Sequence, residues 1–236
     1  MRFRDRREAG RHLAARLVEY ANRPEVIVLA LPRGGVPVAY EIAEAIGAPL
    51  DVFLVRRLGV PGQEELAMGA IATGGARMVN EDVVRYLDIS DETIEAVTEL
   101  ERRELERRER MYRNERPARD IFGRAIILVD DGLATGSTMR DASRLVREHR
   151  PKLLVVAVPV ASSIICGSFS DVADGIVCVC GMAPDPLYAI GLWYDDFTPI
   201  PDEEVRELLE QSGRRDAGLE TRDGQENSSS LARRAA

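Results

Sequence analysis

The stretch that decides the fold is residues 126–138, which read Ile126-Ile127-Leu128-Val129-Asp130-Asp131-Gly132-Leu133-Ala134-Thr135-Gly136-Ser137-Thr138. An apolar run ends in two adjacent carboxylates, a short glycine-containing loop follows, and a helix is predicted to begin at Ser137. The pattern predicts a buried strand that carries both acids at its carboxyl end. The next loop offers backbone N–H groups, hydroxyls and the positive end of a helix, which together suit a phosphate. A ligand with both a diol and a phosphate, such as ribose 5-phosphate, would satisfy both halves.

This stretch resembles the diphosphoribose-binding signature of the type I phosphoribosyltransferases. In that family an apolar strand leads to a pair of acids and then to a loop that ends in Thr-Gly and a small hydroxyl residue. The resemblance implies that Asp130 and Asp131 hold the ribose 2- and 3-hydroxyls. It implies that the 5-phosphate is wrapped by Ala134, Thr135, Gly136, Ser137 and Thr138. The alternative without a binding role is an ordinary buried strand followed by an acidic turn and a capped helix. A P-loop is excluded because it needs a lysine before its Ser/Thr, and this loop has none.

The composition predicts a soluble globular protein with a substantial core. The chain has 236 residues, of which 45% are hydrophobic and 31% charged. A formal net charge of −8 makes it a poor general binder of nucleic acid. It has no apolar run long enough to span a bilayer and no apolar segment after the N-terminus that would suggest a secretory signal, so we expect a cytoplasmic protein. The odd number of cysteines, three, argues against a disulfide framework and favours buried strand thiols.

Alternating strands and helices predict an α/β fold, with an open, mainly parallel sheet covered by helices on both faces. Besides the signature strand, strands are expected at 26–31, 51–56, 153–158 and 175–180, with a short one near 70–72. Helices are expected at 5–21, 36–46, 137–150 and 202–210. We expect one domain over 1–211 with a hood segment at 181–200. The polar residues 212–236 are predicted to form a disordered tail.

Residues 90–116 are predicted to form a long polar helix inserted into this domain. Ser90 can cap it, and a thin apolar stripe contains Ile94, Val97, Leu100 and Leu105. The helix could be a solvated element with many ion pairs, part of a hood, or an arm that supports a homodimer. Its arginines at 102–119 are mixed with glutamates, so they are not interpreted as a nucleic-acid patch.

Two further loops are candidates for binding anions, because ligands of open parallel sheets lie beyond the carboxyl ends of the strands. Arg33, Gly34 and Gly35 follow the first strand and resemble the family's pyrophosphate loop, where a non-proline cis peptide is often found. Arg56 and Arg57 are expected at the end of the second strand. That position resembles the family's basic strand end, which faces pyrophosphate.

In the family, this basic strand end leads into a mobile catalytic loop, which would here span residues 59–65. Arg56 and Glu64 are therefore candidate catalytic residues beside Asp130 and Asp131, and either Glu64 or Glu65 would serve as an acid or base toward the acceptor. The alternative of a solvated glutamate stays open.

A late aromatic segment resembles the part of the family that contacts the acceptor and the metal. The resemblance implies that Trp193 or Tyr194 stacks on the acceptor, and that Asp195 approaches the metal. An aromatic cluster that only closes the core is an equal alternative.

The resemblance implies a Mg²⁺-dependent phosphoribosyltransferase, a glycosyltransferase of the pentosyltransferase class, acting in nucleotide and nucleoside metabolism. It would transfer a phosphoribosyl group from phosphoribosyl diphosphate to a small nitrogenous acceptor and release pyrophosphate. Asp130 and Asp131 would contact the Mg²⁺ indirectly, through the substrate. The chain looks most like the branch known as predicted phosphoribosyltransferases.

The acceptor is not fixed by the sequence. Ala134 stands where many enzymes acting on 6-oxopurines have an aspartate, which argues against hypoxanthine or guanine and does not choose between adenine and uracil. The alternative function is a regulatory protein that senses phosphoribosyl diphosphate and binds nucleic acid or a partner protein.

Overall fold

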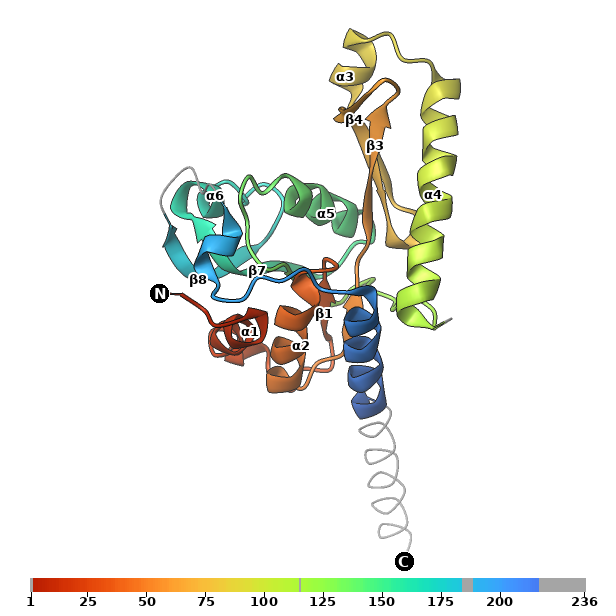
Figure 1. Ribbon diagram of the computed structural model, residues 1–236. Coiled ribbons are helices and arrows are strands. Elements are labelled where there is room, and N and C mark those ends of the chain that lie inside the picture. The colour runs from red at the N-terminus through yellow and green to blue at the C-terminus, as the bar shows by residue number, and fades with distance from the viewer. Residues whose placement is uncertain (1, 115, 184–188, 217–236) are drawn as a thin grey trace, which may run out of the picture.

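The computed structural model describes residues 2–114, 116–183 and 189–216 (Figure 1). Its centre is a five-stranded sheet of order β2-β1-β6-β7-β8, in which every neighbouring pair is parallel. The strands are β1 (Val26–Ala30), β2 (Leu50–Val52), β6 (Ala125–Val129), β7 (Leu153–Ser162) and β8 (Gly175–Ala183). This arrangement confirms the predicted α/β fold with a mainly parallel sheet.

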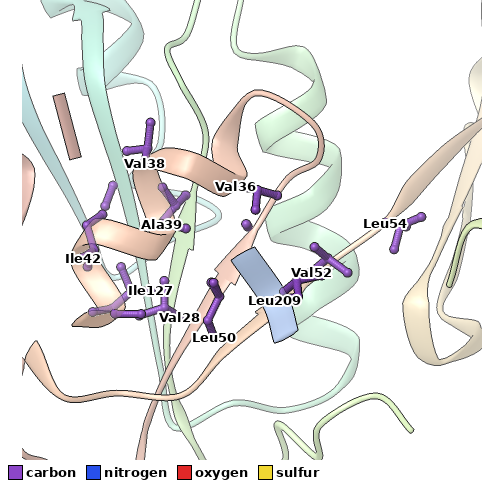
Figure 2. Close-up of a cluster of buried hydrophobic side chains, with 14 of the residues drawn as sticks. Val28, Val36, Val38, Ala39, Ile42, Leu50, Val52, Leu54, Ile127 and Leu209 are labelled. Carbon is purple, nitrogen blue, oxygen red and sulfur yellow. The ribbon is translucent and has the colours of Figure 1, made fainter. Parts of the chain in front are cut away.

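Helices cover both faces of this sheet because its central strands are apolar on both sides. On one face, α1 (Arg6–Ala14) and α2 (Gly35–Ile46) lie over the sheet, and Figure 2 shows Val28 and Ile127 among the side chains of α2. On the other face, Leu29 and Leu128 pack in a second cluster with α5 (Ser137–Glu148). The alternation along β1 and β6 therefore divides the core between two helix layers.

A second, antiparallel sheet of order β3-β4-β5 stands beside the first (Figure 1). This sheet fits the expected hood. It is formed by residues 55–79, however, and not by the segment 181–200 for which a hood was predicted. Its elements are β3 (Val55–Val60), β4 (Gln63–Ala72), η2 (Thr73–Gly75) and β5 (Arg77–Val79), followed by α3 (Glu81–Tyr86) and α4 (Asp91–Arg113). The predicted strand at 51–56 is wrong in one respect: it is split between β2 and β3. Its apolar run continues through Phe53 and Leu54, so periodicity gives no sign that the chain leaves the parallel sheet there.

The long helix predicted at 90–116 is confirmed as α4, which lies along the antiparallel sheet (Figure 1). Ser90 caps it by accepting a hydrogen bond from the backbone N–H of Thr93 at 3.3 Å. The buried face includes Ile94, Thr98 and Leu105, whereas Leu100 is 66% exposed. Leu100 is six positions after Ile94 and therefore falls on the opposite face of a helix with 3.6 residues per turn.

The first and last helices differ in length from their predicted spans. The helix expected at 5–21 ends at Ala14 and is followed by η1 (Val18–Tyr20), although Leu17 stays fully buried. An apolar stripe can therefore continue inward after the helix ends. The last helix covers 202–216 and so extends past position 212, where the tail is predicted to begin. The other tail residues, 217–236, lie outside the described part of the chain.

Two short elements complete the described fold, α6 (Ser163–Gly167) and η3 (Ile190–Trp193). The expected hood segment at 181–200 includes residues 184–188, which are not among those described. Across the described residues, no helix combines the length and the apolar character that crossing a membrane requires.

Candidate functional site

The topology of the parallel sheet places its switch point between β1 and β6. In the order β2-β1-β6-β7-β8, the chain first adds β2 on one side of β1. It then adds β6, β7 and β8 on the other side, so the strand order reverses between β1 and β6. Ligands of open α/β sheets bind at such a switch point, outside the carboxyl ends of the strands. Loop 32–35 follows β1 and loop 130–138 follows β6, so the two predicted anion loops lie on either side of this switch point.

The two loops are in direct contact, and glycines make the contact possible. A Cβ atom on Gly34 would overlap the carboxylate of Asp131, and one on Gly35 would lie 2.7 Å from the carbonyl oxygen of Val129. The peptide between Pro32 and Arg33 is cis, as is often found in the family's pyrophosphate loop. The sequence therefore brings the first loop against the acids of the second.

The two acids of the signature have different surroundings. Asp130 is partly buried, and its Oδ1 atom accepts a hydrogen bond from the backbone N–H of Asp131 at 2.9 Å. Burial raises the pKa of Asp130 well above its usual value, and the charge of Asp131 adds to the rise. Asp131 is 9% exposed and forms an ion pair of 2.8 Å with Arg6. Burial raises the pKa of Asp131 and Arg6 opposes that rise.

Sequence reasoning missed Arg6. This residue belongs to an N-terminal helix whose arginine-rich side looks solvated, and no local signal separates it from its neighbours Arg4 and Arg7. Its contact with Asp131 joins positions 125 residues apart. Only the fold reveals such a contact.

Loop 134–138 has the geometry of an open helix N-terminus. Gly136 has a φ of 74°, a left-handed conformation that glycine adopts easily, and α5 begins at the next residue. Gly136, the residue before α5, has no side chain to cap the helix, and the hydroxyl of Thr135 accepts a long hydrogen bond of 3.4 Å from the backbone N–H of Ser137. Ala134, Thr135, Ser137 and Thr138 are exposed, and the hydroxyls of Thr135 and Ser137 lie 3.2 Å apart. The free N–H groups and hydroxyls form a surface suited to a phosphate.

The two arginines expected at a strand end instead lie within β3 and diverge. Arg57 donates from Nη2 to the hydroxyl of Ser137 at 2.9 Å, so it reaches the phosphate loop. Arg56 forms an ion pair of 2.6 Å with Glu101 of α4. A cavity of about 320 Å³ beside them is also lined by Val55, Thr138 and Asp141. The predicted strand-end position of both arginines is therefore wrong, because β3 turns into a separate sheet.

Residues 59–65 comprise the end of β3, the hairpin turn at 61–62 and the start of β4. Gly62 has a φ of 80°. The backbone N–H of Gly62 donates a hydrogen bond to the Oε1 atom of Glu64 at 3.1 Å. The turn lies at the end of the antiparallel sheet that points away from the parallel sheet (Figure 1). This conformation does not bring Glu64 together with Asp130.

The side chain of Arg33 is half exposed. Its Nη1 atom lies 4.0 Å from an Oδ1 atom of Asp202, which also accepts a hydrogen bond of 2.5 Å from the hydroxyl of Tyr112. A partner this distant holds a surface arginine weakly. Arg33 is therefore available for an anion.

The late aromatic segment packs against the N-terminus. Tyr194 is 1% exposed, its ring lies near Phe3 and Phe197, and its hydroxyl donates to the backbone oxygen of Asp131 at 2.6 Å. The expectation that Tyr194 stacks on an acceptor does not match this burial, since the ring has no free face. Trp193 is only partly buried and packs against the same aromatic cluster.

The structure offers no protein-only metal centre in the part of the chain it describes. No group of three His, Cys, Asp or Glu side chains is arranged there to hold an ion. Asp195, expected to approach the metal, is exposed and pairs with Arg2 at 2.9 Å.

Comparisons with known proteins agree with this geometry. A solved structure from Thermus thermophilus, that of the protein TT1426, superposes with a TM-score of 0.76 at 40% identity, covering 89% of this chain and 98% of that one. Proteins from two strains of Mycobacterium tuberculosis, both named "Putative phosphoribosyl transferase", are 43% identical over 212 residues, or 90% of this chain. The chain spans about half of their length, 47%.

The sequence profile of the phosphoribosyl transferase domain matches residues 4–164. This span includes both anion loops and the two acids at the switch point. The chain belongs to the phosphoribosyl transferase domain family.

Proposed function

We propose that this protein transfers the 5-phosphoribosyl group from phosphoribosyl diphosphate to a nitrogenous acceptor and releases pyrophosphate. One observation carries the proposal: loops 32–35 and 130–138 pack against each other at the switch point of the sheet. Together they offer a carboxylate for a diol and two stretches of backbone that admit anions. A donor with a phosphate at one end and a diphosphate at the other needs both loops.

Each part of the candidate site has a role in this proposed reaction. Asp130 accepts hydrogen bonds from the ribose hydroxyls, residues 134–138 bind the 5-phosphate, and loop 32–35 with Arg33 faces the diphosphate. Holding the donor at both ends fixes the anomeric carbon relative to the acceptor, which lowers the entropic part of the barrier. The carboxylates also stabilise positive charge that develops on the ribose as the bond to pyrophosphate breaks.

We further propose Mg²⁺ as the cofactor. When bound to the diphosphate, the ion would neutralise the negative charge that grows on the leaving pyrophosphate. Mg²⁺ commonly takes few protein ligands and completes its shell with phosphate oxygens and water.

The direct test is the double substitution Asp130→Asn with Asp131→Asn. Both changes keep the size of the side chain, and circular dichroism would check folding. Loss of two charge-assisted hydrogen bonds should weaken binding of phosphoribosyl diphosphate about 100-fold or more, measured by calorimetry. Unchanged binding by a folded variant would reject the ribose assignment.

A screen for pyrophosphate release would identify the acceptor. It would use phosphoribosyl diphosphate and Mg²⁺ with adenine, uracil, hypoxanthine, guanine and other nitrogenous compounds. Ala134 leads us to expect turnover with an acceptor other than hypoxanthine or guanine. Release that no acceptor stimulates would contradict the transferase proposal.

The alternative of a nucleic-acid-binding regulator draws less support. Four arginines of α4 are paired within the helix: Glu99 contacts Arg102 and Arg103, and Glu104 contacts Arg107 and Arg108. These pairs reduce the positive potential of α4, the segment considered for binding nucleic acid. Salt-dependent binding to RNA or DNA would favour the alternative.

A further inference from the structure

Arg6 is a buried arginine beside the candidate site. It is the first residue of α1 and is 7% exposed. Arginine is almost never buried this far unless its charge is paired. The position of Arg6 is also well defined, because Asp5 caps α1 by accepting a hydrogen bond from the backbone N–H of Glu8 at 2.7 Å.

Three contacts hold the guanidinium of Arg6 in one orientation. Its Nε atom donates to Oδ2 of Asp131 at 2.8 Å, and its Nη1 atom donates to the backbone oxygen of Thr198 at 2.9 Å. Its central carbon also lies 3.8 Å from the centre of the Phe197 ring, within the range of a cation–π contact. The guanidinium is thus surrounded by protein groups.

Asp131 is constrained from other directions as well. The hydroxyl of Tyr194 donates to its backbone oxygen at 2.6 Å, and Gly34 lies so close to its carboxylate that a Cβ atom could not be accommodated. Oδ2 is therefore committed to Arg6, and the side chain has little freedom to turn. Asp130 has no such cationic partner among the described contacts, so the two acids of the signature are not equivalent.

We infer that Arg6 is a positioning residue of the ribose site, which acts by holding Asp131 so that its other carboxylate oxygen accepts a ligand hydroxyl. The inference rests on the proposed function. The N-terminal helix and the segment at 194–198 thus support the site. Arg6 itself would not contact the ligand. A group that orients a ligating side chain affects affinity without touching the ligand.

The test compares Arg6→Gln and Arg6→Lys with the matched control Arg7→Gln. Arg7 is adjacent, but its side chain is 43% exposed and pairs with Glu41 at 3.1 Å, away from the acids. Calorimetry would measure the affinity of each full-length variant for two probes. Ribose 5-phosphate engages the diol and the phosphate loop, whereas inorganic phosphate engages only anion sites.

Arg6→Gln should weaken ribose 5-phosphate binding by about 10- to 100-fold, the range for losing a group that orients a ligand-binding side chain. Its affinity for inorganic phosphate should stay within about twofold of the parent protein by the same argument. Arg6→Lys keeps the charge but loses the forked geometry, so it should show a smaller loss for ribose 5-phosphate alone. Arg7→Gln should bind both probes like the parent.

Each other outcome overturns the inference. Equal weakening of both probes would assign Arg6 a merely structural role, and tighter binding of ribose 5-phosphate would mean that Arg6 competes with the ligand. If Arg6→Gln does not fold, Arg6→Lys decides in the same way. Failure of the parent protein to bind ribose 5-phosphate or phosphoribosyl diphosphate would instead reject the proposed function, and the inference with it.

Discussion

The Nη2 atom of Arg57 lies 2.9 Å from the Oγ atom of Ser137, so an arginine of the antiparallel sheet contacts the first residue of α5. The resemblance to the family's basic strand end predicted that Arg57 faces pyrophosphate. The contact favours the 5-phosphate instead, because Ser137 opens the helix whose free N–H groups suit that phosphate. Arg57 would then connect the hood sheet to the phosphate end of the donor.

We therefore predict that Arg57→Gln weakens ribose 5-phosphate binding about tenfold, through the loss of one charge-assisted hydrogen bond. Pyrophosphate binding should change less. Arg56→Gln is the matched control, since Arg56 is engaged with Glu101 and should leave ribose 5-phosphate affinity near the parent value. Calorimetric titration of both probes measures the difference. A larger effect of Arg57→Gln on pyrophosphate would return this arginine to the diphosphate end.

Gly34→Ala should disturb the contact between the two loops. The added Cβ atom would overlap the Asp131 carboxylate, which Arg6 and Tyr194 prevent from moving aside. Forcing an extra carbon into a packed site costs about 1–3 kcal/mol, and urea unfolding would show it. Gly175→Ala is the control, because a Cβ atom there has no neighbour within 4 Å. A Gly34→Ala variant as stable as this control would show that loop 32–35 shifts freely from the acids.

Local pattern was sufficient to predict the strand, acids, loop and helix of residues 126–138. Their chemistry depends on neighbours along the chain: an apolar run, a glycine with positive φ and a helix start at Ser137. The alternating contacts of β1 and β6 follow from the same local pattern, since residues buried on both sides identify a central parallel strand. For such elements, the hydrophobic pattern of the sequence directly reflects the burial that the structure shows.

The unpredicted features depend on contacts between distant segments. Arg6 meets Asp131 across 125 positions, and Tyr194 is fixed by Asp131 and Phe3. The exit of the chain from the parallel sheet after Val52 occurs inside an apolar run, so hydrophobicity alone does not mark it. Each of these features depends on tertiary packing between distant segments, and no local sequence pattern indicates it.

The cysteines give a prediction about pH. Cys166 lies in α6, outside any strand, and the neighbouring thiol of Cys178 lowers the pKa of the Cys166 thiol to about 7. A lowered pKa means that the reactive thiolate appears at lower pH, so alkylation of Cys166 by iodoacetamide should rise with a midpoint near pH 7. Cys178→Ala removes this neighbouring thiol and should move the midpoint toward higher pH. Mass spectrometry of the modified peptide reports the rate, and an unchanged midpoint in that variant would exclude Cys178 as the cause of the lowered pKa.

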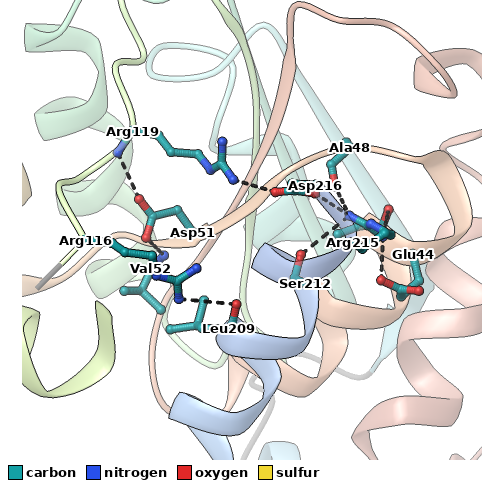
Figure 3. A network of polar contacts seen from close by, with 11 residues as sticks. Glu44, Ala48, Asp51, Val52, Arg116, Arg119, Leu209, Ser212, Arg215 and Asp216 are labelled. Carbon is teal, nitrogen blue, oxygen red and sulfur yellow. Dashed lines mark hydrogen bonds and ion pairs between the residues drawn. The ribbon is translucent and has the colours of Figure 1, made fainter. Parts of the chain in front are cut away.

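The buried ion pair between Arg113 and Asp51 connects the end of α4 to the edge of the parallel sheet. Arg113 is 4% exposed and donates to Oδ1 of Asp51 at 2.8 Å and to the backbone oxygen of Val52 at 2.6 Å. Figure 3 shows that Asp51 also accepts from the backbone N–H of Arg119, at 3.0 Å. The carboxylate therefore joins β2, α4 and the segment that follows α4.

Arg113→Leu should destabilise the protein by about 3–5 kcal/mol, because it leaves the carboxylate of Asp51 buried without its cation. Arg103→Leu is the control on the same helix. Arg103 pairs with Glu99 at the surface, where such a pair contributes about 0.5 kcal/mol or less. Urea unfolding of both variants measures the two changes. If Arg113→Leu costs no more than Arg103→Leu, water reaches Asp51 after the substitution, and the attachment of α4 to β2 depends on apolar packing around Leu105 and Tyr112 instead.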